Sequence, residues 1–280
     1  MSVTIVTDST CDLSPQMLNE FGIKMVPLKV YFGEDVYKDW VELDPVSFYQ
    51  KLTQATELPR TSQPSPEEFA NVFKQELENG NEIVSIHLSS KLSGTFNSAC
   101  LARDMLDSSK IFVVDGKTAS IGTGILAILA KRLADEGKSA KEIAEKITKK
   151  TDTIRHLFAV ETLEYLKKGG RISPAKATIG NILNIKPILH LVDGVVEPFD
   201  KVRGMKRALP RIIEEVKKKG LDLKNQLCGL SYAGPLDEAS EYANMLKQEL
   251  SPGELIVTQI GSVIGTYVGP GTVAFIFFEE

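Results

Sequence analysis

The chain has 280 residues, of which 42% are hydrophobic and 25% charged, as expected of a globular protein with one large or two medium domains. A net charge of −4 excludes the basic excess of a general nucleic-acid binder, so we expect no nucleic-acid partner. The scattered Cys11, Cys100 and Cys228 favour a reducing cytoplasm. The N-terminus lacks signal-peptide features, and the longest apolar stretch, 121–130, is far shorter than the roughly 20 residues of a membrane span. We therefore expect a cytoplasmic protein without stable membrane insertion.

In the first half of the chain, short apolar runs alternate with helical patterns. The predicted strands are 3–6, 25–31, 83–88 and 111–114. The predicted helices are 15–21, 45–54, 66–79, 94–107, 118–136 and 139–151. This alternation predicts a mainly parallel sheet covered by helices. Ligands of such sheets lie beyond the carboxyl ends of the strands. Asp8-Ser9-Thr10 and Ser93 follow two of those ends.

The pattern changes near 151–156, where a lysine-rich helix ends. The predicted strands that follow are 187–192, 195–201, 226–232, 254–259 and 272–278. The predicted helices that follow are 161–168, 173–182, 204–219 and 235–250. Asp193-Gly194 predicts a two-residue hairpin turn, because a type I′ turn needs positive φ at both positions. We predict two directly packed α/β domains, 1–155 and 156–280, with a ligand cleft between them.

A turn rich in hydroxyl groups, Ser89-Ser90-Lys91-Leu92-Ser93-Gly94-Thr95, joins an apolar strand to a helix. The free N–H groups and the dipole of a helix N-terminus favour a carboxylate or phosphate, and Gly94 permits close approach of the backbone. A simple capping role for Ser93 fits the same segment. The turn alone leaves both interpretations open.

A second polar segment, Arg60-Thr61-Ser62-Gln63-Pro64-Ser65-Pro66, precedes the helix predicted at 66–79. Ser65, Pro66 and Glu68 form an ordinary capping box. This leaves Thr61 and Ser62 without a local structural role, so they are candidates for the same ligand as Ser93. We expect Thr61 to reach Ser93 and the end of the first strand from a loop.

Six short motifs follow one another in a specific order over nearly the whole chain. They are Thr7-Asp8-Ser9-Thr10, Arg60-Thr61-Ser62-Gln63-Pro64, Leu92-Ser93-Gly94-Thr95, Leu166-Lys167-Lys168-Gly169-Gly170-Arg171-Ile172, Lys186-Pro187-Ile188-Leu189 and Ile264-Gly265-Thr266-Tyr267-Val268-Gly269-Pro270-Gly271. Together they resemble the DegV family, bacterial proteins that bind one long-chain fatty acid and serve as the fatty-acid-binding subunit of a fatty acid kinase.

The resemblance implies that Thr61 and Ser93 hold the carboxylate of the fatty acid, with Ser62, Gly94 and Thr95 as secondary contacts. Burying ~15 methylenes at ~0.8 kcal/mol each gives ~12 kcal/mol before ordering costs, so an apolar cavity is expected for the tail. No cofactor is expected in this chain. A separate ATP-using kinase catalytic subunit would phosphorylate the fatty acid while this chain holds it.

One position departs from the family, which usually has a His where this chain has Tyr267. A phenol donates a hydrogen bond but cannot become cationic, so Tyr267 is either a head-group contact or an interface residue. Arg171 follows a double glycine, where a cation stabilises a helix C-terminus. The resemblance implies instead that Arg171 contacts the kinase, and the basic residues of 201–207 are candidates to join it.

The alternative function is an enzyme that acts on a small carboxylate or phosphate ester in the cleft between the domains. It would use Asp8, Ser93 and a neighbouring histidine, and it predicts a wet, polar cleft with a nucleophile in contact with a base. His87, His156 and His190 lack metal-ligand spacing, so no metal is expected. No recognisable base lies near Ser93 in the sequence, which favours the binding function.

Overall fold

The computed structural model describes residues 2–173 and 184–279. Its first sheet has four parallel strands in the order β2-β1-β6-β7. In that order the strands are Lys24–Val26, Val3–Asp8, Glu82–His87 and Ile111–Asp115. Helices α3 (Pro66–Glu78) and α4 (Thr95–Leu106) cover one face, and α5 (Ile121–Asp135) and α6 (Ala140–Thr153) cover the other. The predicted parallel sheet covered by helices is confirmed.

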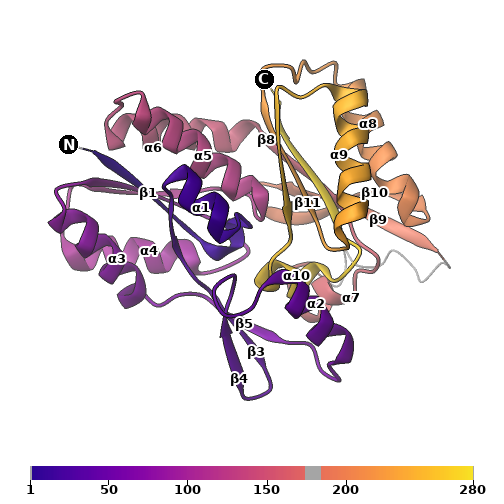
Figure 1. Cartoon of the computed structure of the whole chain (residues 1–280), viewed down its shortest axis with the longest axis horizontal. Helices are drawn as coiled ribbons and strands as arrows, with labels where there is room; N and C mark the ends of the chain where they lie inside the picture. Colours follow the sequence, from indigo (N-terminus) through magenta and orange to yellow (C-terminus); the bar gives the residue numbers. More distant parts are fainter. Residues whose placement is uncertain (1, 174–183, 280) are drawn as a thin grey trace.

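The second sheet has six strands in the order β10-β9-β8-β13-β11-β12, and only β11 and β12 pair in parallel. In that order the strands are Val195–Arg203, Ile185–Val192, Ile154–Ala159, Val273–Phe278, Leu227–Tyr232 and Glu254–Gln259. Helices α8 (Ala208–Lys218) and α9 (Leu236–Leu250) cover one face of this sheet (Figure 1).

A third, antiparallel sheet carries the polar segment after residue 59 into the middle of the molecule. Its order is β4-β3-β5, with bounds Asp35–Lys38, Lys29–Phe32 and Arg60–Ser62. Phe48, from α2 (Pro45–Gln54), packs under this sheet with Val263, from α10 (Ser262–Val268). An N-terminal sheet is therefore joined to a C-terminal helix by a shared apolar core. The remaining elements are η1 (Ser9–Cys11), α1 (Pro15–Phe21), α7 (Glu164–Lys168) and η2 (Met205–Arg207).

Helix α5 packs against both larger sheets, which is why they lie so close together. Its residues are buried on both faces, and a Cβ atom at Gly229 of β11 would come within 2.8 Å of both Ile121 and Ile125. Glycine at 229 thus lets the second sheet approach the helix. The prediction that the two halves pack directly agrees with this arrangement.

Local signals placed several elements correctly. Helices α1 and α2 have the predicted bounds, and each starts with a proline after a Ser or Asp cap. The hairpin between β9 and β10 has φ of 48° at Asp193 and 79° at Gly194, which confirms its predicted positive φ values. The helix predicted at 173–182 lies outside the described residues, apart from Ser173.

One prediction from the strand patterns is wrong, and one strand was not predicted. The single strand at 25–31 is interrupted at Pro27, which has no N–H to donate, and its two parts join different sheets as β2 and β3. The lysine-rich helix α6 ends at Thr153, inside the predicted region, but β8 begins directly after it and pairs with β13 and β9. The predicted boundary after residue 155 falls inside β8, and the division into domains stays a prediction.

Candidate ligand-binding site

A cavity of about 350 Å³ lies between the two halves of the chain, within the range of about 300–1,000 Å³ typical of ligand pockets. Its walls come from the second and third sheets, from α10 and from the segment 88–93 between β6 and α4. Most of the lining is apolar: Leu28, Leu88, Leu92, Phe158, Leu166, Leu191, Val196, Ile260, Val263, Ile264, Val268 and Ala274. A hydrocarbon chain is the kind of ligand such walls bury favourably.

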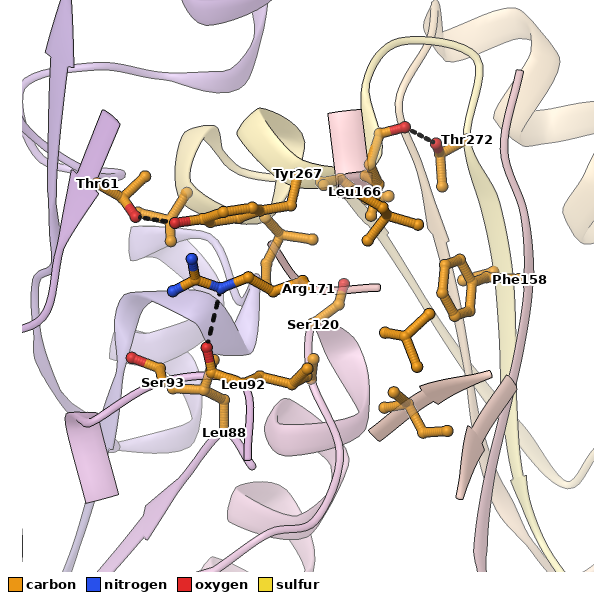
Figure 2. A pocket seen from close by; sticks show the side chains of 18 of the residues that line it. Thr61, Leu88, Leu92, Ser93, Ser120, Phe158, Leu166, Arg171, Tyr267 and Thr272 are labelled. Carbon is orange, nitrogen blue, oxygen red and sulfur yellow. Dashed lines mark hydrogen bonds between the residues drawn. The ribbon is translucent and has the colours of Figure 1, made fainter. Parts of the chain in front are cut away.

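The polar side chains named by the two sequence motifs meet at one end of this cavity. Figure 2 shows Thr61, Ser93, Arg171 and Tyr267 together there, whereas Phe158 lies toward the other end. Thr61 comes from β5 and not from the expected loop. The arrangement gives the cavity a polar end and an apolar end.

Thr61 and Tyr267 form the first part of the polar end. Their hydroxyl groups share a hydrogen bond of 2.6 Å, which links a strand of the third sheet to α10 (Figure 2). A Cβ atom at Gly169 would come within 2.3 Å of the ring of Tyr267, so the absence of a side chain at 169 makes room for that ring. Tyr267 therefore lines the cavity in a fixed position beside Thr61.

Ser93 forms the second part of the polar end, two residues before α4 begins. Its Oγ accepts a hydrogen bond of 3.3 Å from the N–H of Thr95 and shares one of 2.9 Å with the Thr95 hydroxyl. The N-cap of α4 is Gly94, which makes no side-chain cap hydrogen bond, so Ser93 is not the cap residue that a simple capping role requires. Ser93 binds the N–H of Thr95 from the position before the cap, and it lies at the cavity wall.

The secondary candidates are placed unequally. Ser62 lines the cavity, and its hydroxyl shares a hydrogen bond of 3.1 Å with Tyr31. Gly94 and Thr95 are not among the residues that line it. What lies against Gly94 is the amide of Gln63, whose Oε1 would be 2.2 Å from a Cβ atom at that position. Gly94 therefore makes room for the side chain of Gln63. Gln63 lines the cavity, although the sequence did not mark it as a ligand contact.

Arg171 lines the cavity as well, which the sequence did not reveal. Its Cζ lies 4.4 Å from the ring centroid of Tyr267, within the range of a cation–π contact. Nε donates to the carbonyl of Leu92 over 3.1 Å (Figure 2), and Nη1 donates to that of Gly169 over 2.7 Å. The guanidinium group is therefore held between Tyr267 and the turn that carries Ser93.

The motif at the end of β1 has a structural role beside the cavity. Asp8 Oδ2 is 2.9 Å from His87 Nδ1, and His87 Nε2 is 2.7 Å from the hydroxyl of Ser85, with all three side chains buried. Asp8, Ser9 and Thr10 are not among the lining residues. The chain Asp8–His87–Ser85 therefore lies inside the first half, and His87 does not contact Ser93 among the described interactions.

A buried acid connects the cavity wall to three parts of the fold. Asp12 accepts a 2.5 Å hydrogen bond from Ser120 and one of 2.9 Å from the N–H of Gly261, and the hydroxyl oxygens of Ser120 and Ser231 lie 3.1 Å apart. Burial raises the pKa of Asp12 to about 8, so the carboxyl group is mostly protonated at neutral pH. Ser120 and Ser231 both line the cavity.

His156 of β8 also lines the cavity, and burial lowers its pKa to about 3. Its Nδ1 lies 3.2 Å from the hydroxyl of Thr118. Within residues 2–173 and 184–279 no cluster of His, Cys, Asp and Glu side chains is arranged to hold a metal ion. In the same residues, no helix has the length and apolar character needed to cross a membrane.

The fold and the cavity define an α/β protein in which two packed halves surround a mainly apolar ligand chamber with hydroxyl groups at one end. The family model of DegV, described as a family of uncharacterised proteins, matches residues 2–280. The chain belongs to the DegV family.

Relatives match along almost the full length of the chain. A DegV domain-containing protein of Caldanaerobacter subterraneus is 39% identical over 278 residues, which cover 99% of each chain. The structure of a DegV family protein from Thermus thermophilus, described by its fatty acid binding, has a TM-score of 0.92 and 37% identity, again over 99% of each chain. A stearic acid-binding protein from Eubacterium ventriosum has a TM-score of 0.90 and 27% identity, over 99% of this chain and 98% of its own.

Proposed function

We propose that this protein binds one long-chain fatty acid, with the carboxylate at Thr61 and Ser93 and the tail along the apolar walls. The observation that carries the proposal is the position of these two hydroxyl groups at one end of a mainly apolar cavity. Relatives described by their binding of fatty acids support it. Ser62 and Tyr267 are further head-group contacts in this proposal, and Gly94 and Thr95 act through the position of Ser93.

The chemistry of the cavity suits a fatty acid because each part of the ligand finds a matching environment. Apolar side chains remove the methylenes from water, which is the main source of affinity. A carboxylate buried without hydrogen bonds would forfeit much of that gain. Hydroxyl donors at one end offset this cost and fix the direction in which the ligand enters.

We further propose that the chain presents the fatty acid to a separate ATP-dependent kinase catalytic subunit in the cytoplasm, which forms the acyl phosphate. This step rests on the family resemblance. Arg171 and the basic residues of 201–207 are the proposed contacts with that kinase. In this proposal the chain itself is not an enzyme. The enzymatic alternative gains no support from Ser93, whose described hydrogen bonds are with Thr95 and not with a base.

Native mass spectrometry of the freshly purified protein tests the binding function, with denaturation to release and identify the ligand. We expect one fatty acid per chain. In Thr61→Val and Ser93→Ala, the affinity for added palmitate should fall by about tenfold to a hundredfold each, because a hydrogen bond to a charged group contributes about 1.5–3 kcal/mol.

Ser108→Ala is the matched control, since Ser108 lies after α4 and away from the cavity. It should bind palmitate like the unmodified protein. A protein that carries no lipid and takes up no added fatty acid would contradict the proposed function. Mixing the loaded protein with the kinase subunit and ATP, and detecting acyl phosphate only when both proteins are present, tests the presentation step.

A further inference from the structure

The part of the cavity far from the polar end contains a histidine, His156 of β8. His156 lies two residues before Phe158, so both side chains are on the same face of the strand, and both line the cavity. Strand β8 runs from the end of α6 toward α7, which packs against α10 beside the polar end (Figure 1). His156 is therefore farther along the strand from the polar end than Phe158 is.

The other polar groups in the lining beyond the polar end have partners within the protein. The hydroxyl oxygens of Ser120 and Ser231 lie 3.1 Å apart, and the hydroxyl of Thr272 donates to a backbone carbonyl over 3.0 Å. The ring of His156 has a partner for Nδ1, which lies 3.2 Å from the hydroxyl of Thr118. Its Nε2 makes no hydrogen bond to the part of the chain that the structure describes.

The ring of His156 forms part of a wall between two spaces. It keeps 6% exposure, and together with Leu191 it lines both the apolar cavity and a second cavity of about 440 Å³. A polar atom without a partner in such a wall is costly, because it has lost its contact with water and gained no hydrogen bond. Nε2 is thus an unused hydrogen-bonding atom beside the tail region of the cavity.

The chemistry of His156 decides which ligand group would pair with Nε2. Burial lowers its pKa to about 3, so the ring is neutral at physiological pH and carries no charge to attract a second carboxylate or a phosphate. In a neutral imidazole Nε2 either donates or accepts, and the contact between Nδ1 and Thr118 is compatible with both forms. A hydroxyl group pairs with either form, because it can both donate and accept.

We propose that His156 Nε2 binds a hydroxyl group on the hydrocarbon tail, so that hydroxylated long-chain fatty acids are ligands of this cavity. The inference rests on the proposed fatty-acid function and deepens it by naming a substrate class. Thr61 and Ser93 fix one end of the ligand in that function, so His156 selects the tail carbon that carries the hydroxyl group. A hydroxyl group at another carbon would face apolar side chains without a partner.

Titration of the unmodified protein with stearate and with a series of monohydroxystearates, each hydroxylated at a different tail carbon, tests this assignment. At most carbons the hydroxyl group should weaken binding relative to stearate by about tenfold or more, because it is buried without a hydrogen bond. At one carbon or its neighbour, binding should be at least as tight as that of stearate. In that complex the nitrogen NMR signal of His156 Nε2 should shift relative to the stearate complex.

Variants at His156 separate a contact with the ligand from a structural role. His156→Phe keeps an aromatic ring without the nitrogen atoms, and the affinity for the favoured hydroxystearate relative to stearate should fall by about tenfold. His156→Gln, whose amide can donate and accept, should show a smaller loss. His190→Phe is the matched control, because His190 lies on β9 and is absent from the lining of the apolar cavity. It should keep the preference of the unmodified protein.

Stearate binding by each variant shows that the variant is folded, and the series on the unmodified protein decides the question without any variant. If every hydroxystearate binds more weakly than stearate, or if His156→Phe keeps the same favoured carbon, the role of His156 is wrong and the fatty-acid function stands. If the unmodified protein binds neither stearate nor any hydroxystearate, the proposed function itself fails.

Discussion

Tyr267 shows how a single residue alters the chemistry of the polar end of the cavity. The family resemblance led us to expect a histidine there, a side chain whose charge can change near neutral pH. The phenol contributes a neutral hydroxyl, hydrogen-bonded to Thr61 over 2.6 Å, and offers its ring to Arg171 at 4.4 Å. In this chain the positive charge at the site thus comes from a neighbour stacked on the aromatic ring and not from the residue at 267.

The buried Asp12 gives a prediction for stability as a function of pH. Its pKa is about 8 in the folded protein against an ordinary value of 3.8, so between these pH values the folded state holds a proton that the unfolded state has lost. Stability therefore falls as the pH rises through this range and levels off above pH 8. His156, with its pKa lowered to about 3, acts in the opposite direction below pH 6.5.

Burial also raises the pKa of Asp39, to about 6, so Asp39 acts in the same direction as Asp12 but mostly at lower pH, and Asp12 dominates the interval from pH 6.5 to 8. Urea unfolding should show a loss of stability of up to about 2 kcal/mol over this interval, because one pKa unit corresponds to about 1.4 kcal/mol. In Asp12→Asn, a neutral side chain of nearly the same shape, this part of the pH dependence should disappear. Equal slopes for the variant and the unmodified protein would show that Asp12 is already ionised at pH 6.5.

At the scale of elements, the end of α7 sets the position of Tyr267 on α10. Gly169 has φ of −74°, which any residue adopts, yet a Cβ atom there would lie 2.3 Å from the Tyr267 ring. Gly170 is the reverse case, with φ of +72° and nothing within 4 Å of an added Cβ atom. A side chain at 169 would therefore act on the ring of Tyr267 by steric contact, whereas a side chain at 170 would strain the backbone and lower stability.

We expect Gly169→Ala to displace the Tyr267 ring and to weaken palmitate binding by about tenfold, the loss of roughly one hydrogen bond to a charged group. Gly170→Ala should lower stability by about 1 kcal/mol through backbone strain and leave palmitate affinity unchanged. Titration with palmitate and thermal unfolding of both variants check this. Equal affinities in the two variants would contradict the steric link between α7 and α10.

The elements that the sequence predicted are those that local chemistry defines. The caps Ser14 and Asp44, each followed by a proline, mark the starts of α1 and α2. By contrast β5 has three residues and depends on pairing with β3, and α10 begins at Ser262, after a Gly261 cap that offers no side chain. Short elements held by distant partners leave little local signal.

The same distinction explains which site residues could be predicted. Thr61 and Ser93 can be predicted because hydroxyl groups stand out in the polar segment and the turn that carry them, and both line the cavity. Arg171 has a sufficient local explanation as a cation at a helix end, and its sequence gives no sign of a place in the lining. That place depends on the approach of α10 and of the turn that carries Leu92. Contacts between segments distant in the sequence cannot be deduced from either segment alone.

At the scale of the whole molecule, α5 makes the two halves depend on each other. Nine of its residues are buried, and they contact β1 of the first sheet as well as β11 and β12 of the second. We expect residues 1–153, expressed alone, to lack a cooperative thermal transition, because one apolar face of α5 would be exposed. Calorimetry of this fragment beside the full chain tests the expectation. A sharp transition in the fragment would show that the predicted first domain folds independently.

The double burial of α5 has a consequence during protein synthesis. A ribosome adds about 5–20 residues per second, so roughly ten seconds separate the appearance of α5 from that of β13, which completes the sheet beyond it. Until then the nascent chain exposes an apolar face of α5 that is buried in the mature protein. We expect this interval to be the period when the chain most needs a ribosome-associated chaperone.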